Sequence, residues 1–158
     1  MPSFQRLVKF IIENEFLESE DRSVIKEVIY KLELDLTTFE EVGDKIKGQI
    51  KIEADIAYLL GRYRDKVNEM RIELEEEEAH VFLEVPKRNE DGYKTSSREF
   101  KAYQFSNPEI AIKRRRFVVL ESLFDSLQLL CRIVFARNDK LKELSINYRR
   151  EMKIDESQ

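Results

Sequence analysis

The sequence predicts an all-α protein built around a long antiparallel helical hairpin with coiled-coil-like heptads, preceded by a pair of shorter helices. Residues 39–78 and 107–152 each place apolar side chains on a seven-residue spacing, a pattern typical of helices that pack along a seam. Charged residues make up 38% of the chain, with only 4 Gly and 3 Pro, which is typical of long helices with solvated faces. The clearest loop, residues 86–92, would join the two segments into the hairpin.

The N-terminal pair is predicted from apolar residues at helical spacing over roughly residues 4–17 and from a second stripe after Ser19, a residue type that caps helices. A basic amphipathic N-terminus can anchor to a membrane, but Arg6 and Lys9 are its only basic residues and an acidic stretch follows. This favours packing onto the rest of the protein. The sequence is therefore divided into an N-terminal helical pair, a hairpin body and a polar tail, at residues 1–36, 37–153 and 154–158.

The first hairpin helix is predicted to begin at a Thr-x-x-Glu capping box near residue 37 and to continue to about residue 78. Two polar residues, Gln49 and Glu53, interrupt its apolar seam. They cost stability and can fix either the register or the oligomeric state. Residues 80–85 form either the end of this helix or a short β element, since their β-branched residues favour the strand slightly.

The second hairpin helix is marked by Asn107, which can accept hydrogen bonds at the N-cap, and by Pro108, which suits the first helical position. A short helix precedes it, opened by a capping box from Ser96 to Glu99. The apolar stripe of the second helix is too wide for one partner, which predicts a homo-oligomer larger than a dimer. The predicted oligomerisation residues are Phe117, Leu120, Phe124, Leu127, Cys131, Val134, Leu141 and Tyr148.

The net charge of −4 is unevenly distributed, with a balance of −9 over residues 1–93 and of +7 over residues 94–153. Such polarity indicates an anionic partner or head-to-tail contact between subunits. Basic residues interleaved with aromatic ones favour single-stranded nucleic acid, because cations neutralise phosphates and aromatic faces stack on bases. The candidate nucleic-acid-binding residues are Arg62, Arg64, Lys66, Lys94, Arg98, Lys101, Lys113, Arg114, Arg115 and Arg116.

The basic run at residues 113–116 has a second interpretation, which composition alone favours. It can be the solvated start of a helix, paired across the hairpin with the acidic run at residues 73–78. Cations at a helix N-terminus oppose the dipole by about 0.3–1 kcal/mol each. Something should therefore compensate them, either those glutamates or an external anion.

Enzymatic chemistry is not expected, because the sequence contains neither a Gly-rich phosphate loop nor a Gly-x-Ser-x-Gly elbow. His80 lies one turn after Glu76, but a single His and a single Cys make a catalytic or metal site improbable. No cofactor or metal is expected. The lone Cys131 is typical of a reduced thiol in a cytoplasmic protein. No signal peptide is expected, and no apolar run approaches the roughly 20 residues of a membrane span.

A series of short segments keeps a fixed order over roughly residues 50–151. It consists of Ile52-Glu53-Ala54, Tyr93-Lys94 through Ser97, Glu99-Phe100-Lys101, Leu129-Leu130-Cys131, Arg137, Leu141-Lys142 and Tyr148-Arg149-Arg150-Glu151. In their order and spacing these segments resemble the UvsY-type recombination mediators of large tailed phages. Residues 1–36 and the acidic pI of about 5.3 depart from that family.

The resemblance implies a non-enzymatic protein of DNA recombination, repair and replication in the cytoplasm of a phage-infected cell. It implies a homo-oligomeric ring that binds single-stranded DNA, weakens the hold of the single-strand-binding protein and loads a RecA-like recombinase. The DNA-binding pair of the family would fall near Arg62 and Arg64, and its assembly region near residues 117–148. The alternative, from another functional class, is a helical scaffold or adaptor that binds only proteins.

Overall fold

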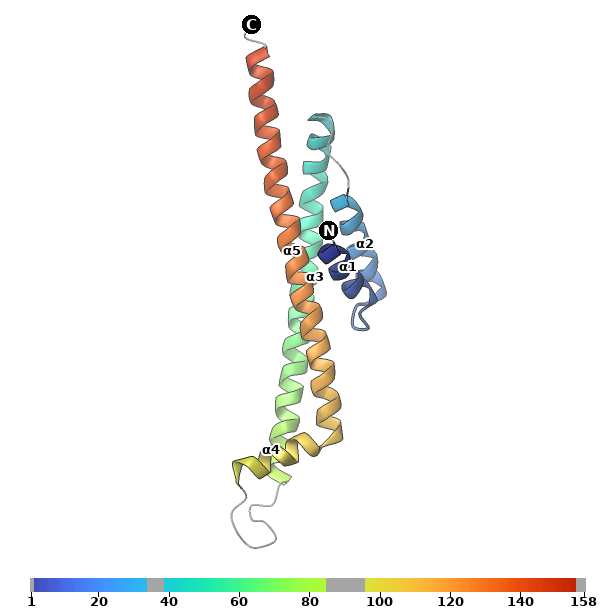
Figure 1. The fold of residues 1–158 in the computed structure, drawn as a ribbon, viewed down its shortest axis with the longest axis vertical. Coiled ribbons are helices and arrows are strands. Elements are labelled where there is room, and N and C mark those ends of the chain that lie inside the picture. Colours follow the sequence, from blue (N-terminus) through green and yellow to red (C-terminus); the bar gives the residue numbers. More distant parts are fainter. Residues whose placement is uncertain (1, 34–38, 85–95, 156–158) are drawn as a thin grey trace. The chain divides into compact units, whose positions relative to one another are not determined.

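The computed structural model describes residues 2–33, 39–84 and 96–155, and these residues form five helices (Figure 1). They are α1 (Pro2–Glu13), α2 (Ser19–Glu33), α3 (Phe39–Glu84), α4 (Ser97–Ser106) and α5 (Pro108–Asp155). No strand occurs within the described ranges, which confirms the prediction of an all-α fold.

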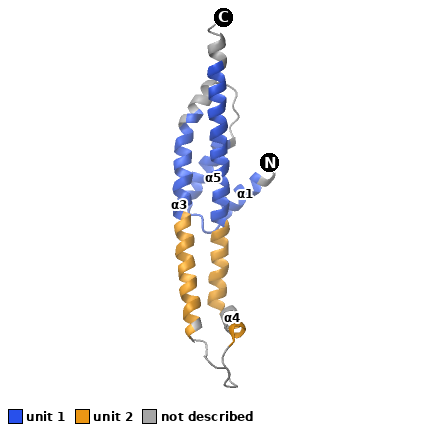
Figure 2. Cartoon of the chain, turned by 90° about the vertical axis from the view of Figure 1, so that its left-hand side faces the viewer, with its two compact units in different colours: residues 1–62, 123–158 blue, residues 63–122 orange. Residues whose placement is uncertain are grey.

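The chain divides into two compact units (Figure 2). Unit 1 contains Met1–Arg62 and Leu123–Gln158, and unit 2 contains Tyr63–Ser122. Within each unit a segment of α3 lies antiparallel to a segment of α5, so the predicted helical hairpin is confirmed. The sequence-based division at residues 36 and 153 stays a prediction.

The core of unit 1 is made by α1, α2 and the adjoining segments of α3 and α5. On α1 and α2 the buried and half-buried residues recur at helical spacing, so each helix turns one face toward the core. Each such side chain contributes about 1.5–3 kcal/mol when it is removed from water. The buried apolar residues of this unit are Ile11, Leu17, Ile25, Val28, Ile29, Ile52, Ile56, Leu59, Leu123, Leu127, Leu130, Cys131, Val134 and Leu141.

The first helix is shorter than predicted, because α1 ends at Glu13 rather than near residue 17. Asn14 follows it, and its side-chain Oδ1 accepts a hydrogen bond from the N–H of Phe16 at 3.0 Å. Such a local bond offers the backbone an alternative to the helix. The guanidinium of Arg22 then donates to the carbonyl oxygens of Asn14 and Leu17, at 3.4 and 3.2 Å.

The second helix begins at the predicted residue, Ser19, but this residue is not the cap. The carbonyl of Glu18 accepts the first helical hydrogen bond, from the N–H of Arg22 at 2.9 Å. Glu18 is therefore the N-cap and Ser19 the first helical position.

The third helix continues to Glu84, beyond the predicted end near residue 78. The β element considered for residues 80–85 is therefore not formed over residues 80–84, and Val85 lies outside the described residues. The capping box predicted near residue 37 also lies outside them.

The polar residues of the α3 seam face α5 in unit 1. Gln49 is buried, and its side-chain amide donates to the carbonyl of Val134 at 3.4 Å. Asn138 is also buried and donates from its side-chain amide to Glu53. Because a shift of one helical turn would separate both pairs, this arrangement supports the register role of Gln49 and Glu53. Burial, with a smaller contribution from the charge of Glu53, also raises the pKa of the Cys131 thiol.

Replacement of Asn138 by Ala should lower the free energy of unfolding by about 1–3 kcal/mol, because the carboxylate of Glu53 then loses its donor inside the hairpin. Asp139→Ala is the matched control, since the adjacent Asp139 is exposed and lies only near Lys142, at 3.8 Å. Urea denaturation followed by circular dichroism measures both variants. Equal stabilities would show that the Asn138–Glu53 contact contributes nothing.

Candidate nucleic-acid interface

Acidic and basic runs meet on facing helices of unit 2. Lys113 on α5 donates to Glu77 on α3, and the guanidinium of Arg114 donates to Glu78 at 2.7 Å. The second interpretation of the basic run therefore holds for Lys113 and Arg114. The carboxylates also compensate for two cations placed near the positive end of the α5 dipole.

A further ion pair joins the same two helices of unit 2. Arg71 lies 3.6 Å from the carboxylate of Glu121, and its guanidinium lies 5.7 Å from the ring of Phe117. Arg71 was not among the residues predicted to form a site. The sequence shows that the two helices carry opposite charges. Which cation pairs with which carboxylate can be deduced only when the register of the two helices is known.

The aromatic residue of the central basic cluster is not available for base stacking. Tyr63 has 0% of its surface exposed, and the ammonium of Lys66 lies 4.7 Å from the centre of its ring. Tyr63, which stands between Arg62 and Arg64 in the sequence, is therefore buried and does not present a face to a base. It occupies the inward-facing seam position that its heptad spacing predicts.

The remaining basic candidates of unit 2 lie on the surface. Arg64 is exposed and lies 3.5 Å from its neighbour Asp65. The other exposed candidates are Arg98 and Lys101 on α4, and Arg115 and Arg116 on α5. Figures 1 and 2 show α4 at one end of unit 2, leading into the start of α5. Lys94 lies outside the described residues.

Two predicted caps fix the starts of these basic helices. Ser96 and Glu99 form the capping box reciprocally, at 2.6 Å from the Ser96 N–H to the carboxylate and 3.3 Å from the Glu99 N–H to the hydroxyl. The Ser96 N–H holds the pKa of Glu99 below its usual value. The side-chain oxygen of Asn107 accepts from the N–H groups of Glu109 and Ile110, at 2.9 and 3.3 Å. Both caps are confirmed.

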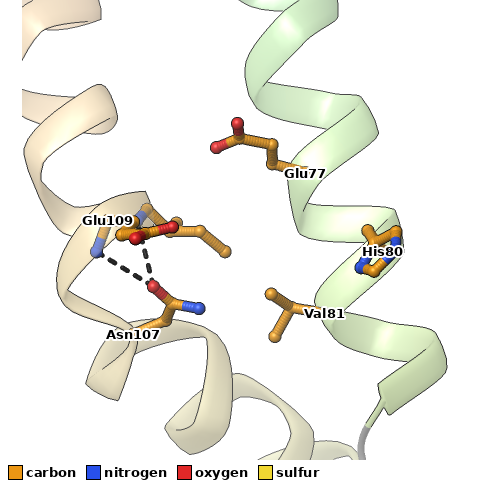
Figure 3. A pocket seen from close by; sticks show the side chains of 6 residues that line it. Glu77, His80, Val81, Asn107 and Glu109 are labelled. Carbon is orange, nitrogen blue, oxygen red and sulfur yellow. Dashed lines mark hydrogen bonds between the residues drawn. The ribbon is translucent and has the colours of Figure 1, made fainter.

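A cavity of about 320 Å³ lies beside the Asn107 cap (Figure 3). Two of its polar side chains are engaged by the protein itself, because Glu77 binds Lys113 and the oxygen of Asn107 caps α5. Within the described ranges no group of three or more His, Cys, Asp or Glu residues could hold a metal ion. The cavity is lined by Glu77, His80, Val81, Asn107, Glu109 and Ile110.

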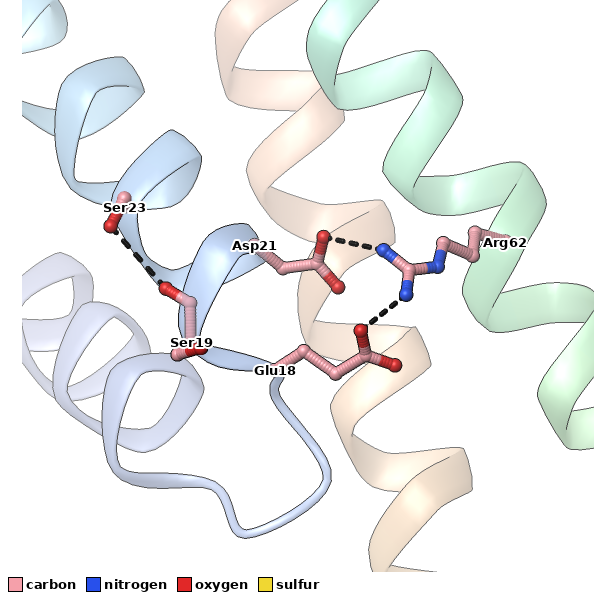
Figure 4. Close-up of polar contacts among 5 residues, drawn as sticks. All are labelled: Glu18, Ser19, Asp21, Ser23 and Arg62. Atoms are coloured by element: carbon pink, nitrogen blue, oxygen red, sulfur yellow. Dashed lines mark hydrogen bonds and ion pairs between the residues drawn. The ribbon is translucent and has the colours of Figure 1, made fainter.

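Arg62 belongs to unit 1 and is engaged by the N-terminal helices (Figure 4). One guanidinium nitrogen lies 2.8 Å from the carboxylate of Asp21, and another donates to Glu18. The hydrogen bond to Glu18 and the charge of Asp21 raise the pKa of Arg62. No sequence pattern connects these residues, which are more than 40 positions apart in the chain.

The predicted oligomerisation residues contribute mainly to the interior of one chain. Five are buried, and the other three are half-buried. Heptad spacing identifies a seam but does not say whether the partner belongs to the same chain. The oligomer stays a prediction, and the exposed apolar residues of α5 are better placed to support it. The buried set is Leu120, Leu127, Cys131, Val134 and Leu141; the half-buried set is Phe117, Phe124 and Tyr148.

None of the helices in the described part of the chain combines the length and apolar character needed to cross a membrane. Comparison with protein-family models, with curated proteins and with solved structures gives no match to this chain.

Proposed function

We propose that this protein is a recombination mediator that binds single-stranded DNA as a homo-oligomer. It would load a RecA-like recombinase in place of the single-strand-binding protein. The observation that supports DNA binding best is the set of exposed basic side chains in unit 2, which are Arg98 and Lys101 on α4 and Arg115 and Arg116 on α5. Residues 96–116 contain six basic and two acidic side chains, an excess of the sign that attracts phosphates. The collinear resemblance to UvsY-type mediators supports the finer assignment.

Substitution of two adjacent arginines tests the role of these side chains. Arg115→Gln should weaken oligonucleotide binding and reduce the salt slope by about 0.7, the value of one phosphate contact on a single strand. Arg114→Gln is the matched control, because it removes the same charge from a side chain already paired with Glu78. Fluorescence anisotropy at several salt concentrations measures both slopes. Identical slopes in the two variants would contradict a contact at Arg115.

A helical adaptor that binds only proteins is the second candidate. The exposed apolar side chains of α5 favour it, since Phe135 and Ile146 lie three turns apart along one side of the helix. Such residues are suited to a protein partner. This function predicts that no oligonucleotide binds, even at low salt, where electrostatic contacts are strongest.

A further inference from the structure

The single positive charge of Arg62 is paired with two negative charges. Two carboxylates, Glu18 from the turn before α2 and Asp21 from its first turn, approach one guanidinium from α3 (Figure 4). These three side chains together carry a charge of −1, where Arg62 alone would carry +1. The guanidinium of Arg62 is thus already engaged by carboxylates, which compete with any phosphate group that approaches it.

The two contacts differ in how easily they can be exchanged. The side chain of Glu18 is 45% exposed and that of Arg62 is 31% exposed, whereas Asp21 is only 5% exposed. Ion pairs at exposed positions are weak, because water screens them. The exposed ion pair between Arg62 and Glu18 can thus break while the buried Asp21 remains bound to the guanidinium.

Carboxylate and phosphate oxygens bind a guanidinium in the same geometry, as acceptors to its planar set of N–H donors. We infer that the α1–α2 pair masks Arg62, with Glu18 and Asp21 occupying the positions that phosphate oxygens of single-stranded DNA would take. The inference rests on the proposed function and adds a regulation to it. The N-terminal segment lowers DNA affinity in the resting protein, and displacement of the two carboxylates makes one further cation of unit 1 available to a phosphate.

The test begins with the double variant Glu18→Gln/Asp21→Asn, which keeps the side-chain shapes and removes both charges. Unmasking one arginine should tighten oligonucleotide binding about fivefold to tenfold at 50 mM salt and steepen the salt slope by about 0.7. The matched control is Glu15→Gln/Glu20→Gln. It removes two charges from exposed residues of the same region that do not pair with Arg62. Affinity should change much less in this control.

Substitution of Arg62, alone and together with the two carboxylates, shows whether any gain in affinity depends on this arginine. Arg62→Gln alone should leave the salt slope unchanged, because Arg62 makes no phosphate contact in the resting protein, although the two uncompensated carboxylates should lower affinity slightly. In the Glu18→Gln/Asp21→Asn background the same change should abolish the gain. Circular dichroism melting shows whether each variant folds. If the double variant does not fold, Glu18→Gln alone serves, with a smaller gain that again depends on Arg62.

The outcomes separate the mask from the proposed function. If the wild type binds DNA and the two acidic double variants bind equally, the mask is overturned and the function remains. A salt slope reduced by about 0.7 in Arg62→Gln alone would also overturn the mask, because Arg62 would then contact a phosphate in the resting protein. If no variant binds an oligonucleotide at low salt, the proposed function fails and the mask fails with it.

Discussion

Leu127→Asp is expected to prevent unit 1 from folding, and Leu127→Ala to lower the free energy of unfolding by about 2–5 kcal/mol. Leu127 has 0% of its surface exposed and lies in the core of unit 1. A carboxylate there would have to be buried without a partner, which costs more than the cavity alone. The free energy of unfolding of a small domain is only about 5–15 kcal/mol in total. Circular dichroism and urea denaturation measure the loss.

Leu129 provides the control for this prediction, because it lies two positions away on α5 and is 47% exposed. Leu129→Asp should keep the helical spectrum and the unfolding midpoint close to the wild type, as surface substitutions usually do. A folded Leu127→Asp variant would contradict the arrangement of the hairpin core. Because Leu127 is buried within one chain, a polar residue at this position is expected to affect folding as well as the predicted assembly.

Long oligonucleotides are expected to bind about 100-fold or more tightly than short ones, provided that the protein assembles. In a repeated assembly each set of basic side chains recurs once per subunit, so every later contact forms at an effective concentration in the millimolar range. Phe135→Ser/Ile146→Ser should abolish this dependence on length, because it removes exposed apolar side chains of α5 while leaving the basic residues in place. Anisotropy titrations with a short and a long oligonucleotide, with sedimentation of each variant, measure both properties.

The exposed surface of α5 also supplies a control for assembly. Lys140→Ser/Asn147→Ser changes two exposed polar residues of the same helix and should leave mass and length dependence much closer to the wild type. An assembled wild type that binds both oligonucleotides equally would remove any role for multivalency. A wild type that sediments as a monomer at micromolar concentration would contradict the predicted oligomer.

Features set by neighbouring residues were predictable from the sequence. The caps at Ser96 and Asn107 were predicted because their hydrogen bonds span two or three residues. The long helices were predicted because heptads repeat within each of them. The end of α1 at Glu13 was missed, because the apolar spacing continues past this residue. The side chain of Asn14 accepts a hydrogen bond from the N–H of Phe16, and such a local bond favours a turn over the helix.

Features that depend on distant partners were predictable only in part. The contact of Lys113 with Glu77 was anticipated as one of two interpretations, because the opposed runs carry opposite charge. Which pairs form depends on the register, and periodicity alone does not specify it. The contact of Arg62 with Asp21 could not be anticipated, since it depends on how the N-terminal helices pack on α3. Cations that look equivalent in the sequence therefore differ in their availability to a ligand.

The ion pairs of unit 2 have a consequence for how the hairpin can change in length. Arg71 and Glu78 are seven residues apart on α3, and their partners Glu121 and Arg114 are seven residues apart on α5. A deletion of one residue between one of these pairs would turn its far end by about 100°, away from its partner. A gain of seven residues between the contacts, made in both helices together, would keep both contacts. Natural length variants of this hairpin should therefore differ by whole heptads, with the same number of heptads added to or absent from α3 and α5.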